Sequence, residues 1–259
     1  MKRTKNPAKE AEYRKRAADL VAQMTLHEKV SQMLSWAPAI ERLGIPAYNW
    51  WSEGIHGIGR AGTATVFPQA IGMAAAFDED MMEQVGNAVG VEARGKYNMC
   101  RAHGDRDIFK GLTVWAPNIN IFRDPRWGRG HETYGEDPFL TSRLGVRFVE
   151  GMQGDDPDYL QAAACAKHFA VHSGPESDRH HFNAIVSKQD LWETYLPAFR
   201  ALVKEAGVEA VMGAYNRTNG EPCCGSKTLL KDILRDKWHF DGHVTSDCWA
   251  IKDFHTGHM

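Results

Sequence analysis

The sequence contains few cysteines, no long hydrophobic run and no excess of charge of either sign. The five cysteines are odd in number and form no CxxC motif, which argues against a disulfide scaffold and a structural zinc site. No stretch approaches the roughly 20 consecutive apolar residues of a membrane span, and the first thirty residues carry charges where a secretory signal has an apolar segment. We therefore expect a cytosolic chain without a membrane partner.

Acidic and basic residues nearly cancel, at 33 against 31, so no long-range field favours nucleic acid as a partner. Hydrophobic residues make up 43% of the 259 positions and charged residues 25%, a composition that is typical of globular proteins and excludes a disordered one. The 8 tryptophans and 12 histidines are the unusual feature of the composition. Their positions therefore guide the search for a ligand site.

Short apolar runs alternate with longer amphipathic segments along most of the chain. The apolar runs lie at 45–50, 71–76, 112–121, 162–171, 208–215 and 243–247. The amphipathic segments lie near 79–97, 138–153, 189–206 and 227–238, and are preceded by the helix-capping residues Asp78, Asp137, Ser187 and Ser226. A helix over 9–35, with a restart at the capping box of Thr25, precedes the alternation. The pattern predicts an α/β fold, a parallel sheet covered by helices.

Polar residues follow five of the apolar runs, at the carboxyl ends of the predicted strands. They include Trp51 and Glu53 after the first run, Arg129 after the third, Lys167 and His168 at the fourth, Tyr215 after the fifth and Asp247 after the sixth. Ligands of open α/β sheets and of barrels bind at this edge, where the βα loops gather. The sequence therefore predicts a polar pocket there.

Each candidate also has a purely structural interpretation. Asp247 is either a nucleophile, base or ligand, or the N-cap of a following helix. Lys167 and His168 are adjacent, so both reach one ligand only at a bulge or a strand end; otherwise they are a core histidine and a snorkelling lysine. The arginines of 123–129 suit a polyhydroxylated ligand. They also suit a salt-bridge cluster with Glu132, Glu136 and Asp137.

The histidine-rich segment 172–181 raises the alternative of a metal-dependent hydrolase that uses His172, His180 and His181. Its spacing matches neither HExxH nor a zinc finger. The glycine-rich stretch 54–62 has no Gly-Lys-Ser/Thr and no GxGxxG that opens a helix. We therefore expect no metal and no cofactor.

Five motifs together resemble the N-terminal domain of family 3 glycoside hydrolases, in the branch that contains β-glucosidases and β-xylosidases. They are WWSEGIHG at 50–57, NINIFRDPRWGRGHETYGEDP at 118–138, AKHF at 166–169, YNRTNG at 215–220 and VTSD at 244–247. The similarity runs from about Met24 to the last residue. The resemblance implies a (β/α)8 TIM-type barrel. It also implies that β-glycosides are hydrolysed with retention of the anomeric configuration.

The resemblance assigns a role to each candidate residue. Asp247 matches the nucleophile that forms a covalent glycosyl-enzyme. Arg129, Lys167, His168 and Tyr215 match residues that hold the sugar next to the scissile bond, Lys167 and His168 as hydrogen-bond donors, and Glu53 matches one that grips hydroxyls at its far side. Trp51 and Trp249 are expected to offer aromatic faces to the sugar. The implied substrate is a terminal β-linked glucose or xylose of a short oligosaccharide, or an aryl glycoside.

Two departures from the family pattern modify these expectations. Cys248 stands between Asp247 and Trp249, a pattern more familiar in the xylosidase branch, which favours a pentoside. Retention requires a second carboxylic acid about 5 Å from the nucleophile, which in this branch comes from a following α/β sandwich domain. Only six strands are predicted. We therefore expect 1–259 to be a barrel domain that is incomplete at its C-terminal end and lacks the sandwich domain.

Two alternatives concern the source of the second carboxylic acid, which acts as the general acid. Asp178 and His180 form an Asp-x-His pattern eleven and thirteen residues after Lys167, as in the family's N-acetylglucosaminidase branch, where this dyad is the acid/base. Without any acid, the chain would be a non-catalytic sugar-binding barrel. The sequence makes no prediction of oligomeric state.

Overall fold

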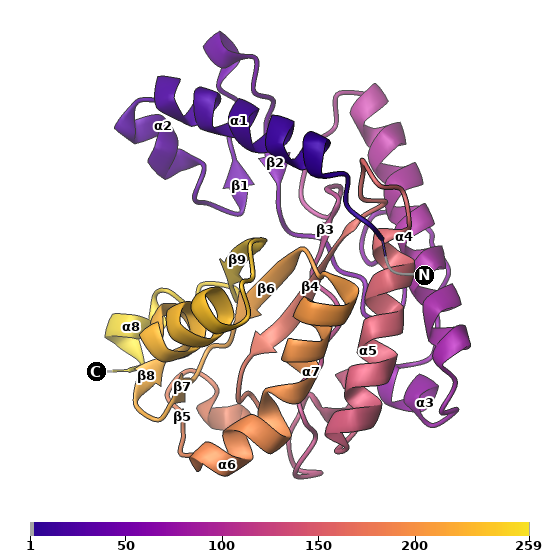
Figure 1. Cartoon of the computed structure of the whole chain (residues 1–259), viewed down its shortest axis with the longest axis vertical. Coiled ribbons are helices and arrows are strands. Elements are labelled where there is room, and N and C mark those ends of the chain that lie inside the picture. Colours follow the sequence, from indigo (N-terminus) through magenta and orange to yellow (C-terminus); the bar gives the residue numbers. More distant parts are fainter. Residues whose placement is uncertain (1–2, 259) are drawn as a thin grey trace.

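The computed structural model describes residues 3–258, in which a four-stranded parallel sheet is flanked by helices (Figure 1). The strands are β3 (Thr113–Val114), β4 (Ala163–Phe169), β6 (Ala210–Gly213) and β9 (His243–Ser246), in that spatial order. A parallel bridge from Ser52 to Val114 continues the sheet beyond β3. Because spatial order repeats chain order without a reversal, the sheet is part of a barrel and not a doubly wound sheet.

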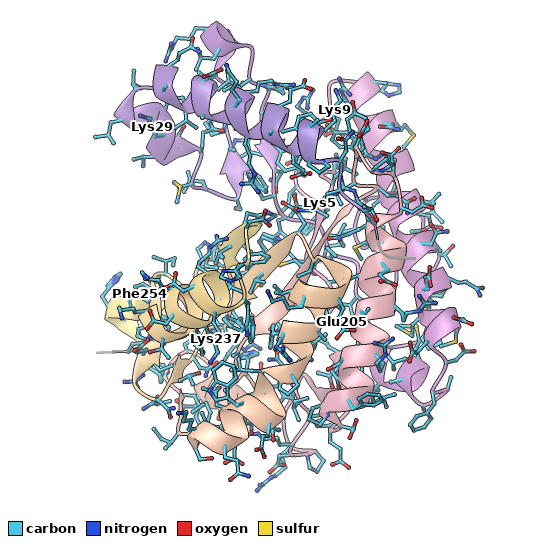
Figure 2. All side chains as sticks on the ribbon, viewed as in Figure 1. Lys5, Lys9, Lys29, Glu205, Lys237 and Phe254 are labelled. Atoms are coloured by element: carbon cyan, nitrogen blue, oxygen red, sulfur yellow. The ribbon has the colours of Figure 1, made fainter. Side chains whose placement is uncertain are left out.

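Helices connect the strands at the predicted positions. The first two are α4 (Glu79–Ala102) and α5 (Pro138–Gln153). The third is a continuous helical segment that consists of α6 (Lys188–Asp190), a π-helical turn (Leu191–Tyr195), α7 (Pro197–Ala201) and a second π-helical turn (Leu202–Ala206). The fourth is the π-type helix Lys227–Lys237. Figure 2 shows Glu205 and Lys237 on the helices of this layer. The four predicted caps are confirmed, since each accepts a hydrogen bond from the third residue after it: Asp78, Asp137, Ser187 and Ser226.

The predicted strand at 71–76 is wrong, because this segment contains helix α3 (Ala70–Ala74). The buried residues Ala70, Met73 and Ala74 recur with a spacing of three and four, which is the period of a helix. The segment also lacks the β-branched residues that favour strands, apart from Ile71. Its apolar character therefore reflects burial of a short helix.

The N-terminal region also differs from the simple alternation. The run at 45–50 contains β2 (Tyr48–Asn49), which pairs antiparallel with β1 (Trp36–Ala37) outside the main sheet. The helix expected over 9–35 is two helices, α1 (Pro7–Gln23) and α2 (Leu26–Ser31), and the predicted capping box at Thr25 separates them. Four strands of the six predicted therefore form the main sheet. Figure 1 shows α1 and α2 in indigo, away from that sheet.

A small three-stranded sheet lies in the loops that follow β4 and β6. Its strands are β5 (Asn183–Ala184), β7 (Arg217–Thr218) and β8 (Glu221–Pro222), with β7 in the middle. The last helix is α8 (Asp253–Thr256). The small sheet ties the two loops together, so it fixes the carboxyl-end rim on which the polar residues stand.

The core lies between the sheet and helices α4 and α5. The two helices pack closely, because glycines bring their backbones together: a side chain at Gly151 would stand 2.1 Å from the carbonyl oxygen of Glu83. Strand residues Val114, Ala164 and Val211 are fully buried against this layer. None of the helices between residues 3 and 258 has the length and apolar character needed to cross a bilayer.

Candidate active site

The carboxyl ends of the parallel strands surround a cavity of about 460 Å3. Five of the predicted residues line it: Glu53, Arg129, Lys167, Tyr215 and Asp247. The other lining residues are Ile55, Trp115, Gly128, Glu132, Glu176, Arg179, Met212 and Cys248. Segments distant in the sequence thus meet where the fold predicts a ligand.

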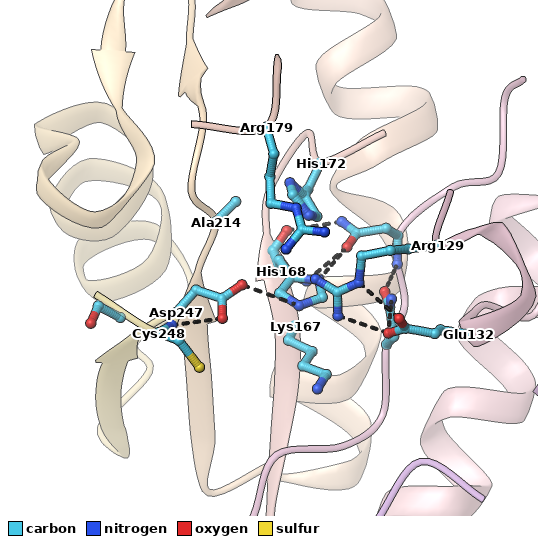
Figure 3. A network of polar contacts seen from close by, with 12 residues as sticks. Arg129, Glu132, Lys167, His168, His172, Arg179, Ala214, Asp247 and Cys248 are labelled. Atoms are coloured by element: carbon cyan, nitrogen blue, oxygen red, sulfur yellow. Dashed lines mark hydrogen bonds and ion pairs between the residues drawn. The ribbon is translucent and has the colours of Figure 1, made fainter. Parts of the chain in front are cut away.

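A strand irregularity brings Lys167 and His168 to the same site. The register of β4 against β6 shifts between Ala166 and Phe169, which is the bulge that two adjacent residues need to reach one ligand. Lys167 lines the cavity, and His168 Nε2 lies 3.4 Å from Asp247 Oδ2 (Figure 3). The interpretation as an unrelated core histidine and snorkelling lysine does not fit this arrangement.

Asp247 directly follows β9 and is 6% exposed. Its Oδ1 accepts a hydrogen bond from the backbone N–H of the adjacent Cys248 at 2.8 Å. An N-cap would accept from the second or third residue of a helix instead. Within residues 3–258, Oδ2 is buried and has no hydrogen-bond partner, so one carboxylate oxygen is held by the backbone and the other is unpaired.

Arg129 forms a two-point ion pair with Glu132 at the side of the cavity. Its Nε and Nη2 donate to the two carboxylate oxygens, each at 2.8 Å. Burial alone would raise the pKa of Glu132, but the hydrogen bonds and positive charge of Arg129, together with the charge of Lys167, outweigh burial and lower it. The pair therefore places a fixed positive group and an ionised carboxylate in the wall of the cavity.

The salt-bridge interpretation of segment 123–129 is correct for Arg129 only. Arg123 donates to the hydroxyl and the carbonyl oxygen of Ser173. Arg126 is exposed and pairs with Asp124. The three arginines thus go to three places, and only one of them lines the cavity.

Glu53 is held between an indole and an ammonium group. Trp51 Nε1 donates to Glu53 Oε1 at 2.6 Å, and Lys167 Nζ lies 3.8 Å from Glu53 Oε2. Trp51 is itself stacked on Trp115, with ring centres 5.2 Å apart. Trp51 thus orients a lining carboxylate, and Trp115 is the ring that lines the cavity.

Trp249 stands at the rim with 76% of its surface exposed. Its ring meets the edge of Trp51 at 6.2 Å. Tyr215, on the loop that follows the neighbouring strand β6, is buried. Burial raises the pKa of Tyr215, and the nearby negative charge of Asp247 raises it further, so its hydroxyl stays protonated and can donate a hydrogen bond.

The histidine-rich segment separates into different environments. His180 Nδ1 lies 2.8 Å from Asp253 Oδ2, and Asp178 instead lies 3.7 Å from His181 Nδ1. His172 is buried against Asn216. Between residues 3 and 258, no three His, Cys, Asp or Glu side chains converge in a way that could hold a metal ion.

Several cavity residues were not predicted from the sequence. Glu176 and Arg179, paired with one another, come from the loop 172–181, in which the sequence pointed only to Asp178 and the histidines. Trp115 and Met212 lie inside apolar runs, where composition gives no sign of a ligand. Asn120, which follows β3 and does not line the cavity, contacts His168 Nδ1 and was not predicted either.

The chain is similar to known proteins along nearly all of its length. The glycosyl hydrolase family 3 N-terminal domain matches residues 16–258. The xylan 1,4-beta-xylosidase of Xylanibacter ruminicola is 52% identical over 249 residues, which cover 95% of this chain and 29% of that protein. The probable beta-D-xylosidase 7 of Arabidopsis thaliana is 47% identical, over 92% of this chain and 33% of that protein.

Solved structures give the same result. A GH3 exo-beta-xylosidase in complex with a xylobiose aziridine probe superimposes with a TM-score of 0.85 at 36% identity, over 94% of this chain and 32% of that one. A beta-glucosidase from Streptomyces venezuelae in complex with D-glucose gives 0.75 at 36% identity, over 91% and 29%. The chain thus spans about a third of the length of these relatives. With a family match over nearly all of its residues and its five motifs around one cavity, the chain belongs to glycosyl hydrolase family 3.

Proposed function

We propose that the chain carries the nucleophile and sugar-binding half of a retaining exo-β-glycosidase. The observation that carries this proposal is the buried carboxylate of Asp247, which lines a cavity together with cations and hydrogen-bonding groups and whose Oδ2 has no hydrogen-bond partner within residues 3–258. A carboxylate at such a position is a nucleophile for a glycosidic carbon. The surrounding arginine, lysine and tyrosine suit the hydroxyls of a sugar.

In the proposed reaction, Asp247 Oδ2 bonds to the anomeric carbon while the bond from that carbon to the leaving oxygen breaks. The leaving oxygen takes a proton from a general acid. Water then attacks the glycosyl-aspartate, gives its proton to the same group and releases the sugar with its original configuration. The developing positive charge on the sugar ring is stabilised by the carboxylate beside it.

The general acid must hold a proton at neutral pH. The three glutamates that line the cavity are unsuited to this role, because each pairs with a cation: Glu53 with Lys167, Glu132 with Arg129 and Glu176 with Arg179. The relatives are much longer than this chain. We therefore propose that the general acid belongs to a region that the relatives contain in addition to the part that this chain matches.

Within this chain, Asp178 and His180 remain the alternative source of the acid. The ring of His180 packs on the ring of Tyr215, a lining residue, with ring centres 4.7 Å apart. His180 is itself paired with Asp253. A dyad with Asp178 would need a rearrangement of this contact.

We propose a β-linked pentose, such as xylose, as the preferred terminal sugar. Cys248 lines the cavity. Its position between Asp247 and Trp249 is the pattern more familiar in the xylosidase branch. The curated relatives named above are xylosidases, and one of the two solved relatives carries a xylobiose probe. A β-glucoside is the alternative, supported by the relative that binds D-glucose.

The test is Asp247→Asn, assayed with an aryl β-xyloside and an aryl β-glucoside. An activated aryl leaving group departs with little help from an acid, so the assay reports on the nucleophile. We expect turnover to be lost and xylose affinity to stay within about tenfold, because the amide keeps the shape of the side chain but is a poor nucleophile.

Asp236→Asn is the control, since Asp236 is an exposed residue that pairs with Lys231 and does not line the cavity. It should retain turnover. A chain that binds xylose but turns over neither substrate before mutation would instead be the sugar-binding alternative.

A further inference from the structure

Two asparagine–histidine pairs of the same design stand side by side beneath the cavity. His168 pairs with Asn120 and His172 pairs with Asn216, and the two imidazole rings lie 4.7 Å apart. All four side chains are buried. Figure 3 shows His168 between the second histidine and Asp247.

The orientation of the Asn120 amide is fixed by its surroundings. Its Nδ2 donates to the carbonyl oxygens of His168 at 2.8 Å and Ala170 at 3.2 Å. An exchange of the amide nitrogen and oxygen would put an oxygen against two carbonyl oxygens, so Nδ2 must stay where it is. Oδ1 therefore faces His168, where it accepts from the backbone N–H and contacts ring Nδ1, each at 2.9 Å.

This orientation decides which ring nitrogen of His168 carries the proton. Since Asn120 Oδ1 is only an acceptor, Nδ1 must be the donor. A neutral imidazole with its proton on Nδ1 has a bare lone pair on Nε2. Burial lowers the pKa of His168, and the positive charge of Arg129 lowers it further, so the ring remains neutral.

The bare nitrogen faces the nucleophile. His168 Nε2 lies 3.4 Å from Asp247 Oδ2, both atoms are buried, and neither is hydrogen-bonded within residues 3–258. Two acceptors that face each other have no hydrogen to share. They are complementary to a ligand that brings its own donor, and a sugar hydroxyl is such a donor.

We propose that Asn120 is a positioning residue that fixes His168 as the neutral imidazole protonated on Nδ1, so that Nε2 accepts a hydrogen bond from the substrate beside Asp247. This reverses the donor role expected for His168 from the sequence. The hydroxyl ligand rests on the proposed function, whereas the protonation pattern is a property of the free protein.

Asn216 provides a matched control for this role. Its Nδ2 donates to the carbonyl oxygens of Val171 and Arg217, so its Oδ1 must likewise accept from His172 Nδ1. The second pair repeats the geometry of the first, but Asp247 is opposite His168 and not opposite His172.

The first test is nitrogen-15 NMR of the histidine rings in the unmodified chain, with the His168 signal identified by its loss in His168→Gln. We expect Nδ1 to be protonated and Nε2 to be unprotonated at neutral pH. A proton on Nε2, whether the ring is neutral or charged, would overturn the proposal. This measurement needs no activity and no variant of Asn120.

The second test is Asn120→Asp, read by the same spectrum and by titration with xylose. A carboxylate beside Nδ1 favours the charged imidazole, so Nε2 should gain a proton and xylose affinity should fall by about tenfold. Asn216→Asp should change the His172 signal and leave the His168 pattern in place. An Asn120→Asp protein in which Nε2 stays unprotonated would contradict the positioning role.

The outcomes separate this inference from the proposed function. Xylose binding that leaves the Nε2 signal of His168 unchanged would contradict the acceptor role alone. If no sugar binds while the free protein shows the expected pattern, the proposed function fails and the role of Asn120 in fixing the ring stands. If Asn120→Asp does not fold, the spectrum of the unmodified chain still decides the protonation pattern.

Discussion

The buried histidines of the site are held neutral, although a carboxylate lies close to one of them. Burial lowers the pKa of His172 to about 3, and the positive charge of Arg129 contributes to the same direction. The rings next to His172 include those of His168 and Tyr215, which are both uncharged at neutral pH. The folded state therefore holds the imidazole of His172 in its neutral form.

A pH dependence of stability follows from His172. Between pH 6.5, the ordinary pKa of the ring, and about 3, the unfolded chain binds a proton at this position that the folded chain does not. Stability should therefore fall on acidification through this window, by about 1.4 kcal/mol per pH unit. When the free energy of unfolding is measured with urea at several pH values, its dependence on pH should be less steep in His172→Gln than in the original chain, by about this amount.

His27→Gln is the control for this measurement. His27 is an exposed residue of α2, so its replacement should leave the pH dependence of unfolding as it is. An unchanged slope in His172→Gln would show that the ring is protonated in the folded chain and would contradict its neutral, buried role.

Among the elements, helices α4 and α5 are in close contact because of glycine at the crossing. A side chain at Gly151 would stand 2.1 Å from the carbonyl oxygen of Glu83 and 2.8 Å from the backbone nitrogen of Asn87, both in α4. These atoms belong to the backbone and cannot rotate away. In the chain, β3 lies between these two helices and β4 follows α5, so the spacing of the helices also affects the position of the site.

We predict that Gly151→Ala separates the two helices and destabilises the fold by about 2 to 4 kcal/mol. Gly95→Ala, in the neighbouring helix α4, is the control, because nothing lies within 4 Å of the added methyl group. That substitution should stabilise the chain by about 0.5 to 1 kcal/mol. Thermal or urea unfolding measures both, and a Gly151→Ala protein as stable as the original would contradict this packing.

The elements that the sequence predicted well are those with both a period and a cap. Helices α4 and α5 begin after Asp78 and Asp137 as expected, because a capping side chain is a local interaction. The segment 71–76 was predicted wrongly because six apolar residues fit a short buried helix as well as a strand. β2 was assigned to the wrong sheet, since pairing with β1 is a tertiary choice that composition does not reveal.

At the scale of the whole molecule, the motifs located the site better than they described its contacts. Asp247, Lys167 and Arg129 line one cavity as their positions after strands predict. The hydrogen bond from Trp51 to Glu53 and the role of Asn120 depend on side-chain orientation across distant segments. Such contacts follow only from the assembled half-barrel, so no local pattern could have predicted them.

The partial barrel explains how about a third of a relative's length can carry the sugar site that we propose. The proposed nucleophile and its neighbours lie on or directly after the neighbouring strands β4, β6 and β9, so their geometry depends on the sheet that the chain itself forms. The account therefore assigns the covalent step to this chain and the protonation step to another group.

The most direct test of that assignment is incubation of the chain with a 2-deoxy-2-fluoro-β-xyloside that carries an activated leaving group, followed by mass spectrometry of its peptides. The fluorine slows release of the sugar from the enzyme, so the covalent intermediate accumulates. We predict one added fluoroxylosyl group on the peptide that contains Asp247, and none in Asp247→Asn. Binding of the compound without a covalent label, or a label on another carboxylate, would contradict the central claim that Asp247 is the nucleophile.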